Sequence, residues 1–288
     1  MLIRIADLLT RRAEWAILLV ALVAGISAAL AGWAAPVNTG VEAVRQSLFS
    51  KPASGETVVV AIDGQSLSEI QNWPWPRSIH GRLVDRLREA GADRIAFDIA
   101  FLDPAGDPAQ DRAFAAAIGR ARGSVVLPAV LENHDGVMGE RVEELPAPML
   151  RRDAEVGAIW IRLDDDLVVR NVPYSVNIAG ARRPSLSTIL AGRATDRAGS
   201  FPLDWSIDPF SFPTVSYADV LAGRFDRRLF EGRNVVVGST SNMLGDQWVV
   251  PYWGRIPGVY IHAVGSETLR RHVPVPVGSG PRSFSSAS

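Results

Sequence analysis

The sequence predicts an α/β protein whose mostly parallel sheet is flanked by helices, carries an antiparallel insertion and is preceded by one transmembrane helix. Runs such as residues 57–62 are apolar and mostly β-branched, as in strands that are buried on both faces. These runs alternate with helical patterns, and that order is typical of parallel sheets with right-handed crossovers. An uncharged run over residues 15–35 precedes all of them.

The uncharged run predicts the membrane topology. A helix needs about 20 apolar residues to cross the bilayer core, and residues 15–35 are just enough. Arg4, Arg11 and Arg12 come before the run, and positively charged flanks stay in the cytoplasm. We therefore expect a single-pass protein of the inner (cell) membrane. Residues 1–14 are cytoplasmic in this prediction, and residues 40–272 form a domain in the periplasm or outside the cell.

A cleaved secretory signal is the alternative explanation of the same run. Ala29-Leu30-Ala31 provides small residues of the kind found at cleavage sites. An anchor is favoured because the apolar run continues beyond this site, and because Trp15 and Trp33 lie near its ends, where indoles prefer the membrane interface. Both explanations place the domain in the same compartment.

The first half of the domain alternates helices and strands. Its helical patterns end at glycines, which favour the backbone conformation found just beyond a helix C-terminus. In chain order we predict a short amphipathic helix over 41–49, a strand over 57–62, a helix over 79–90 closed by Gly91, a strand over 94–99, a helix over 108–122 stopped by Gly123 and a strand over 124–131.

The second half is less regular, and an antiparallel insertion or edge is predicted within it. The predicted elements are a turn over 133–136, two strands over 157–163 and 167–172 joined by Asp164-Asp165-Asp166, a helix over 185–194 capped by Ser185, a surface segment over 198–214, a helix over 216–222 closed by Gly223, a strand over 234–237, a helix over 257–271 and a disordered tail over 273–288.

Composition excludes several classes of function. The formal net charge is −1, so no basic field is present to recruit nucleic acid. The chain contains no cysteine, which excludes thiol catalysis, thiolate metal sites and thiol redox sensing. Without disulfides the extracytoplasmic domain must be held by its core alone, and a hydrophobic content of 47% with 21% charged residues is typical of a globular core.

Polar side chains collect where the predicted strands end. In an open parallel sheet, ligands bind beyond the carboxyl ends of the strands, so residues from distant parts of the chain are expected to converge there. We predict one crevice and a small-molecule ligand, with no cofactor, no metal and no catalytic residue. The candidate ligand-binding residues are Asp63, Arg77, His80, Asp98, Asp103, Ser239, Asp246 and His262.

Each candidate also has a structural explanation. Asp63-Gly64 and Asp103-Pro104 are typical of turns. Asp98 lies within a predicted strand, where an unpaired carboxylate is costly, and Arg77 is the first candidate for its partner, with Asp63 as the other carboxylate that Arg77 could pair with. His262 lies in a helix of mixed pattern, where a hydrogen-bonded core histidine is common.

Common enzyme motifs are absent from the sequence. It contains neither a Gly-x-Ser-x-Gly elbow nor a His-Glu-x-x-His helix. Gly238-Ser239-Thr240-Ser241 follows a strand but lacks the Gly-Lys-Ser/Thr ending of a phosphate-binding loop. The acidic residues and His262 could form an oxygen-rich metal site, although their spacing matches no compact metal-binding loop.

A series of motifs in a fixed order resembles one known family. They run through about residues 45–270, and the chain resembles the CHASE family of type two, the cyclase/histidine-kinase-associated sensory extracellular domains. The motifs are Val59-Val60-Ala61-Ile62-Asp63 with Ser66-Leu67, Trp73-Pro74-Trp75-Pro76-Arg77 with His80, Gly91-Ala92, Phe97-Asp98, Asp103 with Asp107, Pro184-Ser185-Leu186, Ser216-Tyr217-Ala218-Asp219-Val220, Asn234-Val235-Val236-Val237-Gly238-Ser239, Gly245-Asp246 with Pro251, Pro257-Gly258-Val259 and His262-Ala263.

The resemblance implies an extracytoplasmic sensor that follows one membrane helix. Such sensors are usually followed by further membrane helices and a cytoplasmic output module, such as a nucleotide cyclase, a cyclic-di-GMP enzyme or a kinase. This sequence departs from that pattern, because it reaches Ser288 without a second membrane run or an effector module. It is therefore expected to be a fragment or a shortened product whose effector lies elsewhere. The resemblance identifies no ligand-binding residue.

Three hypotheses follow for the function. The first is a membrane-anchored sensor that binds a small ligand and relays a conformational change through its membrane helix, with a homodimer as one option for its assembly. The second is a periplasmic metal-dependent hydrolase that uses the carboxylate cluster. The third is an interaction module that docks another periplasmic protein. A polar-lined crevice, a metal-bridging cluster and an exposed apolar patch, respectively, would distinguish them.

Overall fold

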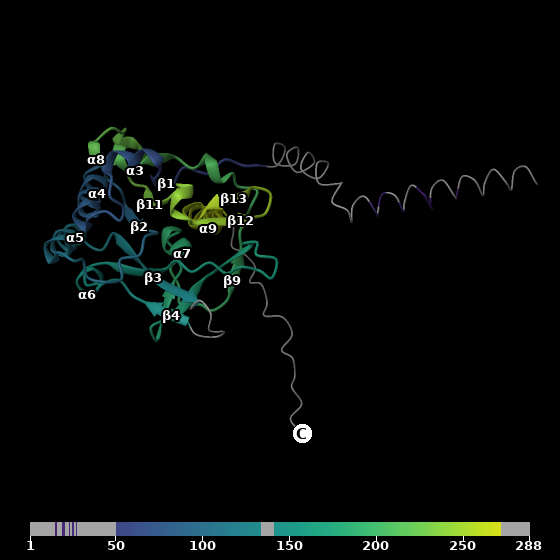
Figure 1. Ribbon diagram of the computed structural model, residues 1–288, viewed down its shortest axis with the longest axis horizontal. Helices are drawn as coiled ribbons and strands as arrows, with labels where there is room; N and C mark the ends of the chain where they lie inside the picture. The colour runs from purple at the N-terminus through teal and green to yellow at the C-terminus, as the bar shows by residue number, and fades with distance from the viewer. Residues whose placement is uncertain are drawn as a thin grey trace, which may run out of the picture. The chain divides into compact units, whose positions relative to one another are not determined.

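The computed structural model describes residues 50–133 and 141–271, together with six isolated helical positions between Trp15 and Ser27. The chain divides into two units, residues 1–50 and 51–288, and the second contains the α/β domain (Figure 1). No helix among the described residues is long and apolar enough to cross a bilayer. Most of the predicted membrane segment, the predicted helix over 41–49, most of the predicted turn over 133–136 and the tail over 273–288 lie outside the described residues.

The central sheet has seven strands and is largely parallel, as predicted. Strand β11 lies between β1 and β2 and is parallel to both, so the predicted strands over 57–62, 94–99 and 234–237 are neighbours in one parallel sheet. Only β4 runs antiparallel among the pairs of this sheet that the structure describes. In spatial order the strands are β10 (Thr214–Ser216), β1 (Thr57–Ile62), β11 (Asn234–Ser239), β2 (Arg94–Phe97), β3 (Val125–Asn133) and β4 (Arg141–Glu144), with β5 (Glu155–Ala158) also paired to β3.

Helices cover both faces of this sheet, which explains why its central strands β1 and β11 are buried along their whole length. In β1, Val58, Val60 and Ile62 face one core, whereas Val59 faces the other. Figure 1 shows the two groups of helices on opposite sides. The first core contains residues of α4 (Arg77–Glu89), α5 (Pro108–Arg120), α6 (Pro148–Arg151) and α8 (Tyr217–Ala222), with α3 (Gly64–Ile70) packed against it; the second contains residues of α7 (Leu186–Leu190) and α9 (Gly258–Arg271).

Local sequence signals account for several helix ends. Ser185 caps α7 as predicted, because its side chain accepts a hydrogen bond from the Thr188 N–H. Gly91 and Gly123 follow the ends of α4 and α5 with φ of 88° and 81°, a conformation that glycine adopts without steric cost. The predicted positions of these two helices are therefore confirmed to within a few residues.

The predicted strand pair over 157–163 and 167–172 is wrong. Strand β5 joins the edge of the main sheet, parallel to β3, and the chain after Ala158 leaves the sheet. The later segment forms β6 (Asn171–Pro173), which pairs with the distant β9 (Ser200–Pro202). Asp164–Asp166 does form a turn, with Arg170 bound to Asp164 and Asp166. A hairpin of β7 (Ser175–Ile178) and β8 (Ala181–Pro184) provides the local antiparallel pair instead.

The segment over 198–214 is not the surface segment that its prolines and aromatic residues predicted. Phe201, Leu203, Trp205 and Ile207 are buried in the same core as α7 and α9. These side chains cover the α9 face of the sheet, where few helices are available to do so. The segment also contains a short 3₁₀ helix, η1 (Pro209–Ser211), and begins the edge strand β10.

A hairpin after β11 brings the chain back to the sheet ahead of the last helix. Strands β12 (Gln247–Val250) and β13 (Gly254–Pro257) pair antiparallel, and α9 begins directly after Pro257, as predicted. The remaining short elements are the 3₁₀ helices η2 (Arg227–Leu229) and η3 (Asn242–Leu244). Because η3 and β12 follow the carboxyl end of β11, this connection lies at the edge of the sheet where a ligand site is expected.

Candidate functional site

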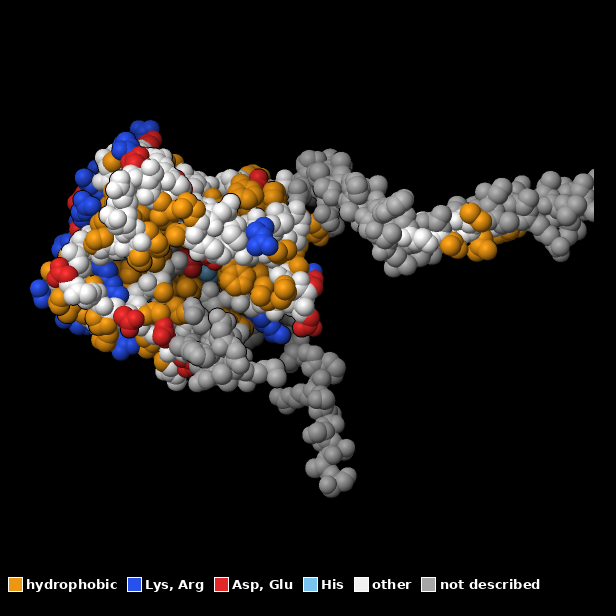
Figure 2. Space-filling model, viewed as in Figure 1, with side chains coloured by type: hydrophobic (Ala, Val, Ile, Leu, Met, Phe, Trp, Pro, Cys, Tyr) orange, Lys and Arg blue, Asp and Glu red, His pale blue; other side chains and the backbone are white. Residues whose placement is uncertain are grey.

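A cleft of about 1150 Å³ opens at the carboxyl ends of β1, β2 and β11. Figure 2 shows the surface hollowed on this face, with hydrophobic side chains around a few acidic ones. The size is in the range of small-molecule sites or somewhat larger. Its lining includes Ile62, Asp98 and Ser239 at the strand ends, Asp246 and Trp248 from the β11–β12 connection and β12, and Trp160 and Arg162 from the segment after β5.

Asp98 is a largely buried carboxylate that lines the cleft. It follows Phe97, which faces the α4 core, so strand alternation turns Asp98 toward the α9 face. Its side chain is only 8% exposed, and Oδ1 lies 3.6 Å from Nε2 of His262. The other oxygen, Oδ2, is buried and has no hydrogen-bond partner within the described part of the chain. A buried carboxylate oxygen without a partner is costly, so this position calls for a donor.

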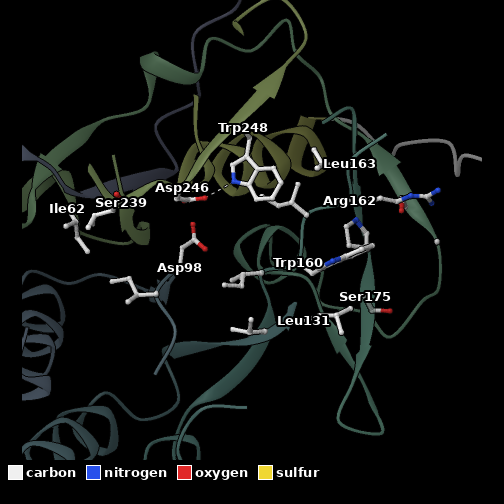
Figure 3. A pocket seen from close by; sticks show the side chains of 18 of the residues that line it. Ile62, Asp98, Leu131, Trp160, Arg162, Leu163, Ser175, Ser239, Asp246 and Trp248 are labelled. Atoms are coloured by element: carbon white, nitrogen blue, oxygen red, sulfur yellow. Dashed lines mark hydrogen bonds between the residues drawn. The ribbon is translucent and has the colours of Figure 1, made fainter. Parts of the chain in front are cut away.

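Asp246 faces Asp98 across the end of the cleft (Figure 3). Its Oδ1 accepts a hydrogen bond of 2.7 Å from Nε1–H of Trp248. Burial and, after it, the charge of Asp98 raise the pKa of Asp246 to about 6. The carboxylate packs on Gly258 at the start of α9, where a Cβ would lie 2.5 Å from both of its oxygens. Glycine is therefore the residue that lets Asp246 lie against this helix.

Ser239 also lines the polar end of the cleft, whereas His262 lies beside Asp98 and does not line it. His262 is 1% exposed, and neither of its ring nitrogens has a hydrogen-bond partner among the described residues. It lies one helical turn beyond Gly258 on α9 and stands behind Asp98. Ser239 ends β11, and its hydroxyl donates to the Ser241 carbonyl at 3.3 Å. Four of the eight predicted residues are thus brought together.

Three tryptophans that line the cleft were missed as candidates from the sequence. Trp73, Trp160 and Trp248 are all half-buried, and each packs against a different apolar core. Two of them carried a signal in the sequence: Trp73 lies in the motif that ends at Arg77, and Trp248 lies two residues after Asp246. Arg162 also lines the cleft, and within the described residues it makes no ion pair.

The other four predicted residues do not line this cleft. Asp63 caps α3: its Oδ1 accepts hydrogen bonds from the Ser66 N–H at 2.8 Å and from the hydroxyl of Ser216 at 3.0 Å. Asp103 is exposed, and its backbone carbonyl accepts a hydrogen bond from Arg77. Most of the candidates were expected in or directly beside one crevice, but Asp63 instead caps a helix and Asp103 lies in an exposed loop.

Arg77 pairs with Asp111, so the predicted pairing with Asp98 or Asp63 is wrong. Arg77 begins α4 and Asp111 lies in the first turn of α5, and the two helices pack on the face of the sheet opposite α9. Asp111 also accepts a hydrogen bond from the Ala105 N–H at 2.8 Å. The ion pair therefore joins two helices and the loop before α5.

His80 is a core residue on that same face. Nδ1 lies 2.9 Å from the hydroxyl of Tyr217, and the rings of Phe97, Phe101 and Phe114 surround the imidazole. Burial, together with the charge of Arg77, lowers the pKa of His80 to about 3. His80 is consequently neutral at physiological pH and packs as an aromatic residue.

Comparison with known proteins gives one match. The family model described as CHASE2 domain matches residues 16–283, which is nearly the whole chain. No curated protein and no solved structure matches it. The match spans the sheet, the cleft and α9, as well as the motifs in Phe97-Asp98, Gly245-Asp246 and His262-Ala263. The chain therefore belongs to the CHASE2 domain family, a family of extracellular sensory domains.

Proposed function

We propose that this chain is the extracytoplasmic sensory part of a transmembrane signalling receptor. In this proposal a small molecule binds in the cleft, and the domain passes a conformational change to a membrane helix over residues 15–35 and on to a cytoplasmic output module outside this chain. The domain itself is not an enzyme. CHASE2 family membership supports the sensory role, and the cleft supports ligand binding.

The observation that carries the proposal is the polar end of the cleft. Asp98 and Asp246 come from connections that are 148 residues apart, yet their carboxylates face each other at the same edge of the sheet (Figure 3). Oδ2 of Asp98 has no partner among the described residues. Stable domains rarely retain buried polar atoms of this kind without a use, so a ligand that satisfies them is a direct explanation.

Helix α9 supplies a route from the cleft to the start of the domain. Its first turn lies against Asp246, and it is 14 residues long, which corresponds to about 20 Å. Near its other end the buried Glu267 accepts hydrogen bonds from the Ser54 N–H at 3.0 Å and the Ser54 hydroxyl at 2.7 Å. Arg271 binds the carbonyl of Pro52. A ligand that moves α9 would therefore move residues 52–54, which follow the N-terminal unit.

The relay operates as a shift between two populations of the domain. A ligand changes such an equilibrium only by the difference between its affinities for the two states. Contacts at the start of α9 differ between an occupied and an empty cleft, because Asp246 packs directly on Gly258. The rigid helix then carries the displacement to Glu267, whose contacts with Ser54 can adjust in response.

The hydrolase and docking hypotheses have less support. No group of three or more His, Asp or Glu side chains is arranged to hold a metal ion within the described residues. The apolar side chains at the cleft line a concave site and do not form a flat exposed patch. A concave site with few polar groups is the usual form of a small-molecule pocket, which favours the sensor.

A ligand of this cleft is expected to raise the melting temperature of the full-length chain. The screen uses purified protein in detergent and small organic acids, amines, sugars and amino acids. Trp160→Ala should remove the effect because Trp160 forms a wall of the cleft. Trp253→Ala is the matched control, since this tryptophan does not line the cleft and instead donates to the Trp205 carbonyl.

The same experiment tests the relay. Ligand binding should change hydrogen exchange of the Ser54 amide, which is bonded to Glu267. A compound that still raises the melting temperature of Trp160→Ala binds outside the cleft and contradicts the cleft assignment. A hit that binds in the cleft without altering exchange at residues 52–54 contradicts the route through α9.

A reporter fused after Ser288 is expected to be active in the periplasm and inactive in the cytoplasm. Arg4, Arg11 and Arg12 precede the uncharged run over 15–35, and such positive flanks stay inside. A paired fusion to a reporter that fluoresces only in the cytoplasm is the control. Cytoplasmic activity contradicts the orientation, and a mature N-terminus at Gly32 contradicts an uncleaved anchor.

A further inference from the structure

We propose that the ligand carries a positively charged amine, which binds between the carboxylates of Asp98 and Asp246, and an apolar body, which packs against the tryptophans of the cleft. This inference rests on the proposed function, since it specifies the chemical class that the cleft recognises.

Asp98 lacks a hydrogen-bond donor to one of its carboxylate oxygens. Its side chain is more than nine-tenths buried and lines the cleft, while Oδ2 has no partner among the described residues. The nearest basic group is His262, whose Nε2 is 3.6 Å from the other oxygen, beyond hydrogen-bond distance. A ligand ammonium group would give this carboxylate a charge-assisted hydrogen bond, which is stronger than one from a neutral donor.

The carboxylate of Asp246 places a second acidic group opposite Asp98. Asp246 faces it in Figure 3, and the carboxylate of Asp246 accepts a hydrogen bond from the indole N–H of Trp248. Two carboxylates that share a buried site repel each other, and a cation between them relieves this repulsion. An anionic ligand would add a third negative charge. A neutral ligand could donate hydrogen bonds but would leave the repulsion in place.

The cleft is lined by tryptophan side chains. Trp73, Trp160 and Trp248 reach the cleft from three different apolar cores. The hydrogen bond from Trp248 to Asp246 holds that indole beside the carboxylate pair. Indole rings attract organic cations through their faces and also bury apolar groups. Arg162, the cation of the cleft lining, points away from the carboxylate pair in Figure 3, so it leaves the place between them free.

A bare metal ion fits these residues less well. Divalent cations in proteins are held by several oxygen or nitrogen ligands at short range. Within the described residues, no three His, Asp or Glu side chains are arranged for this purpose. The tryptophans would also contribute nothing to a hydrated metal ion, whereas they match the body of an organic amine.

The test compares three probes of nearly equal size with the full-length chain in detergent. They are 2-phenylethylamine, the neutral 2-phenylethanol and the anionic 3-phenylpropanoate, with binding measured by calorimetry. We expect the amine to bind at least tenfold more tightly than either of the others. Asp98→Asn and Asp246→Asn should each weaken amine binding at least tenfold. Asp93→Asn should leave it unchanged, because Asp93 is an exposed carboxylate at the opposite end of the same strand, β2.

The pH dependence of binding provides an independent measurement. Burial and the charge of Asp98 place the pKa of Asp246 near 6, so the site gains a negative charge as the pH rises from 5 to 7.5. The amine stays protonated over this range. Asp98, from the end of β2, and His262, from α9, are the charged or titratable side chains that face Asp246 within the described residues. Amine binding should therefore tighten with pH, and less so in Asp246→Asn.

The possible outcomes separate this inference from the proposed function. If 2-phenylethanol or 3-phenylpropanoate binds as well as the amine and Trp160→Ala removes that binding, the cleft is a ligand site but the cation class is wrong. If Ca²⁺ competes with the amine, and Asp98→Asn abolishes this competition, the carboxylates of Asp98 and Asp246 bind a metal ion. That result would also overturn the proposal of an amine ligand. If no probe binds, or if both Asp→Asn variants bind the amine normally, the inference fails.

Discussion

Replacing Arg77 with alanine is expected to destabilise the domain by about 3–5 kcal/mol, because it leaves the carboxylate of Asp111 buried and without its cation. The two side chains are 13% and 8% exposed, and their ion pair joins the start of α4 to the first turn of α5. Arg77 also donates to the Asp103 carbonyl, so the loop before α5 loses a contact as well.

The same two helices provide a matched control for this prediction. Arg120 of α5 binds Asp85 of α4, but the side chains are 52% and 26% exposed. Exposed pairs are typically worth about 1 kcal/mol or less, so Arg120→Ala should hardly change the stability. Thermal and denaturant unfolding of the full-length chain measure both variants.

A second variant separates a structural pair from a ligand contact. The double substitution Arg77→Met with Asp111→Leu should recover much of the lost stability, because it removes both buried charges together. If Arg77→Ala instead leaves the melting temperature unchanged while ligand response is lost, Arg77 acts at the rim of a site and the structural assignment is wrong.

Replacing His80 with glutamine is expected to reduce the loss of unfolding free energy between pH 7 and pH 4 by about 3 kcal/mol relative to the wild type. Burial and the charge of Arg77 hold the pKa of His80 at about 3, whereas an unfolded histidine titrates near 6.5. Below pH 6.5 the unfolded state therefore binds a proton that the folded state does not. The stability that the neutral imidazole contributes is complete above pH 6.5 and is lost as the pH falls toward 3.

The measurement is the difference in the free energy of unfolding between the wild type and His80→Gln at each pH. The raised pKa of Asp246, caused by burial and by Asp98, has the opposite effect, because its folded form takes up a proton before the unfolded form does. Both proteins contain Asp246, so its contribution cancels in the comparison. Glutamine does not titrate and can still donate to or accept from the Tyr217 hydroxyl, which lies 2.9 Å from Nδ1 of His80. Parallel stability curves would show that His80 is protonated or solvated in the folded state.

The local pattern of the chain was sufficient to predict the central layers of the fold. The runs over 57–62, 94–99 and 234–237 are mostly apolar, and their few polar residues lie at or next to their ends, so they are expected to be buried strands regardless of their partners. The helices over 79–90 and 108–122 show an apolar periodicity and end at glycines with positive φ. These features depend on neighbouring residues only, which is why they can be recognised without a structure.

Strand pairing and burial in the second half depended on contacts that are far apart in the sequence. Strand β6 pairs with β9, about 30 residues later, although the segment over 167–172 was predicted to pair with the adjacent segment over 157–163. Residues 198–214 are rich in proline and aromatic residues and were predicted to be a surface segment, yet they bury Phe201 and Trp205 because the α9 face of the sheet needs a cover. A short segment does not reveal which surface another part of the chain leaves open.

The candidate site shows the same division between local and distant information. Asp63 and Asp98 both follow buried strands, so the sequence assigned them the same role. A helix begins directly after Asp63, and its N–H groups satisfy that carboxylate, whereas none follows Asp98, so an oxygen of that carboxylate has no partner among the described residues.

The sequence by itself determined the fold class, the family and the edge of the sheet where polar residues gather, because apolar periodicity and motif order are properties of the chain. Only the tertiary structure decided that Asp246 meets Asp98 and that Arg77 meets Asp111. These partners depend on which face of the sheet each connection crosses, and that choice is made by the packing of distant segments.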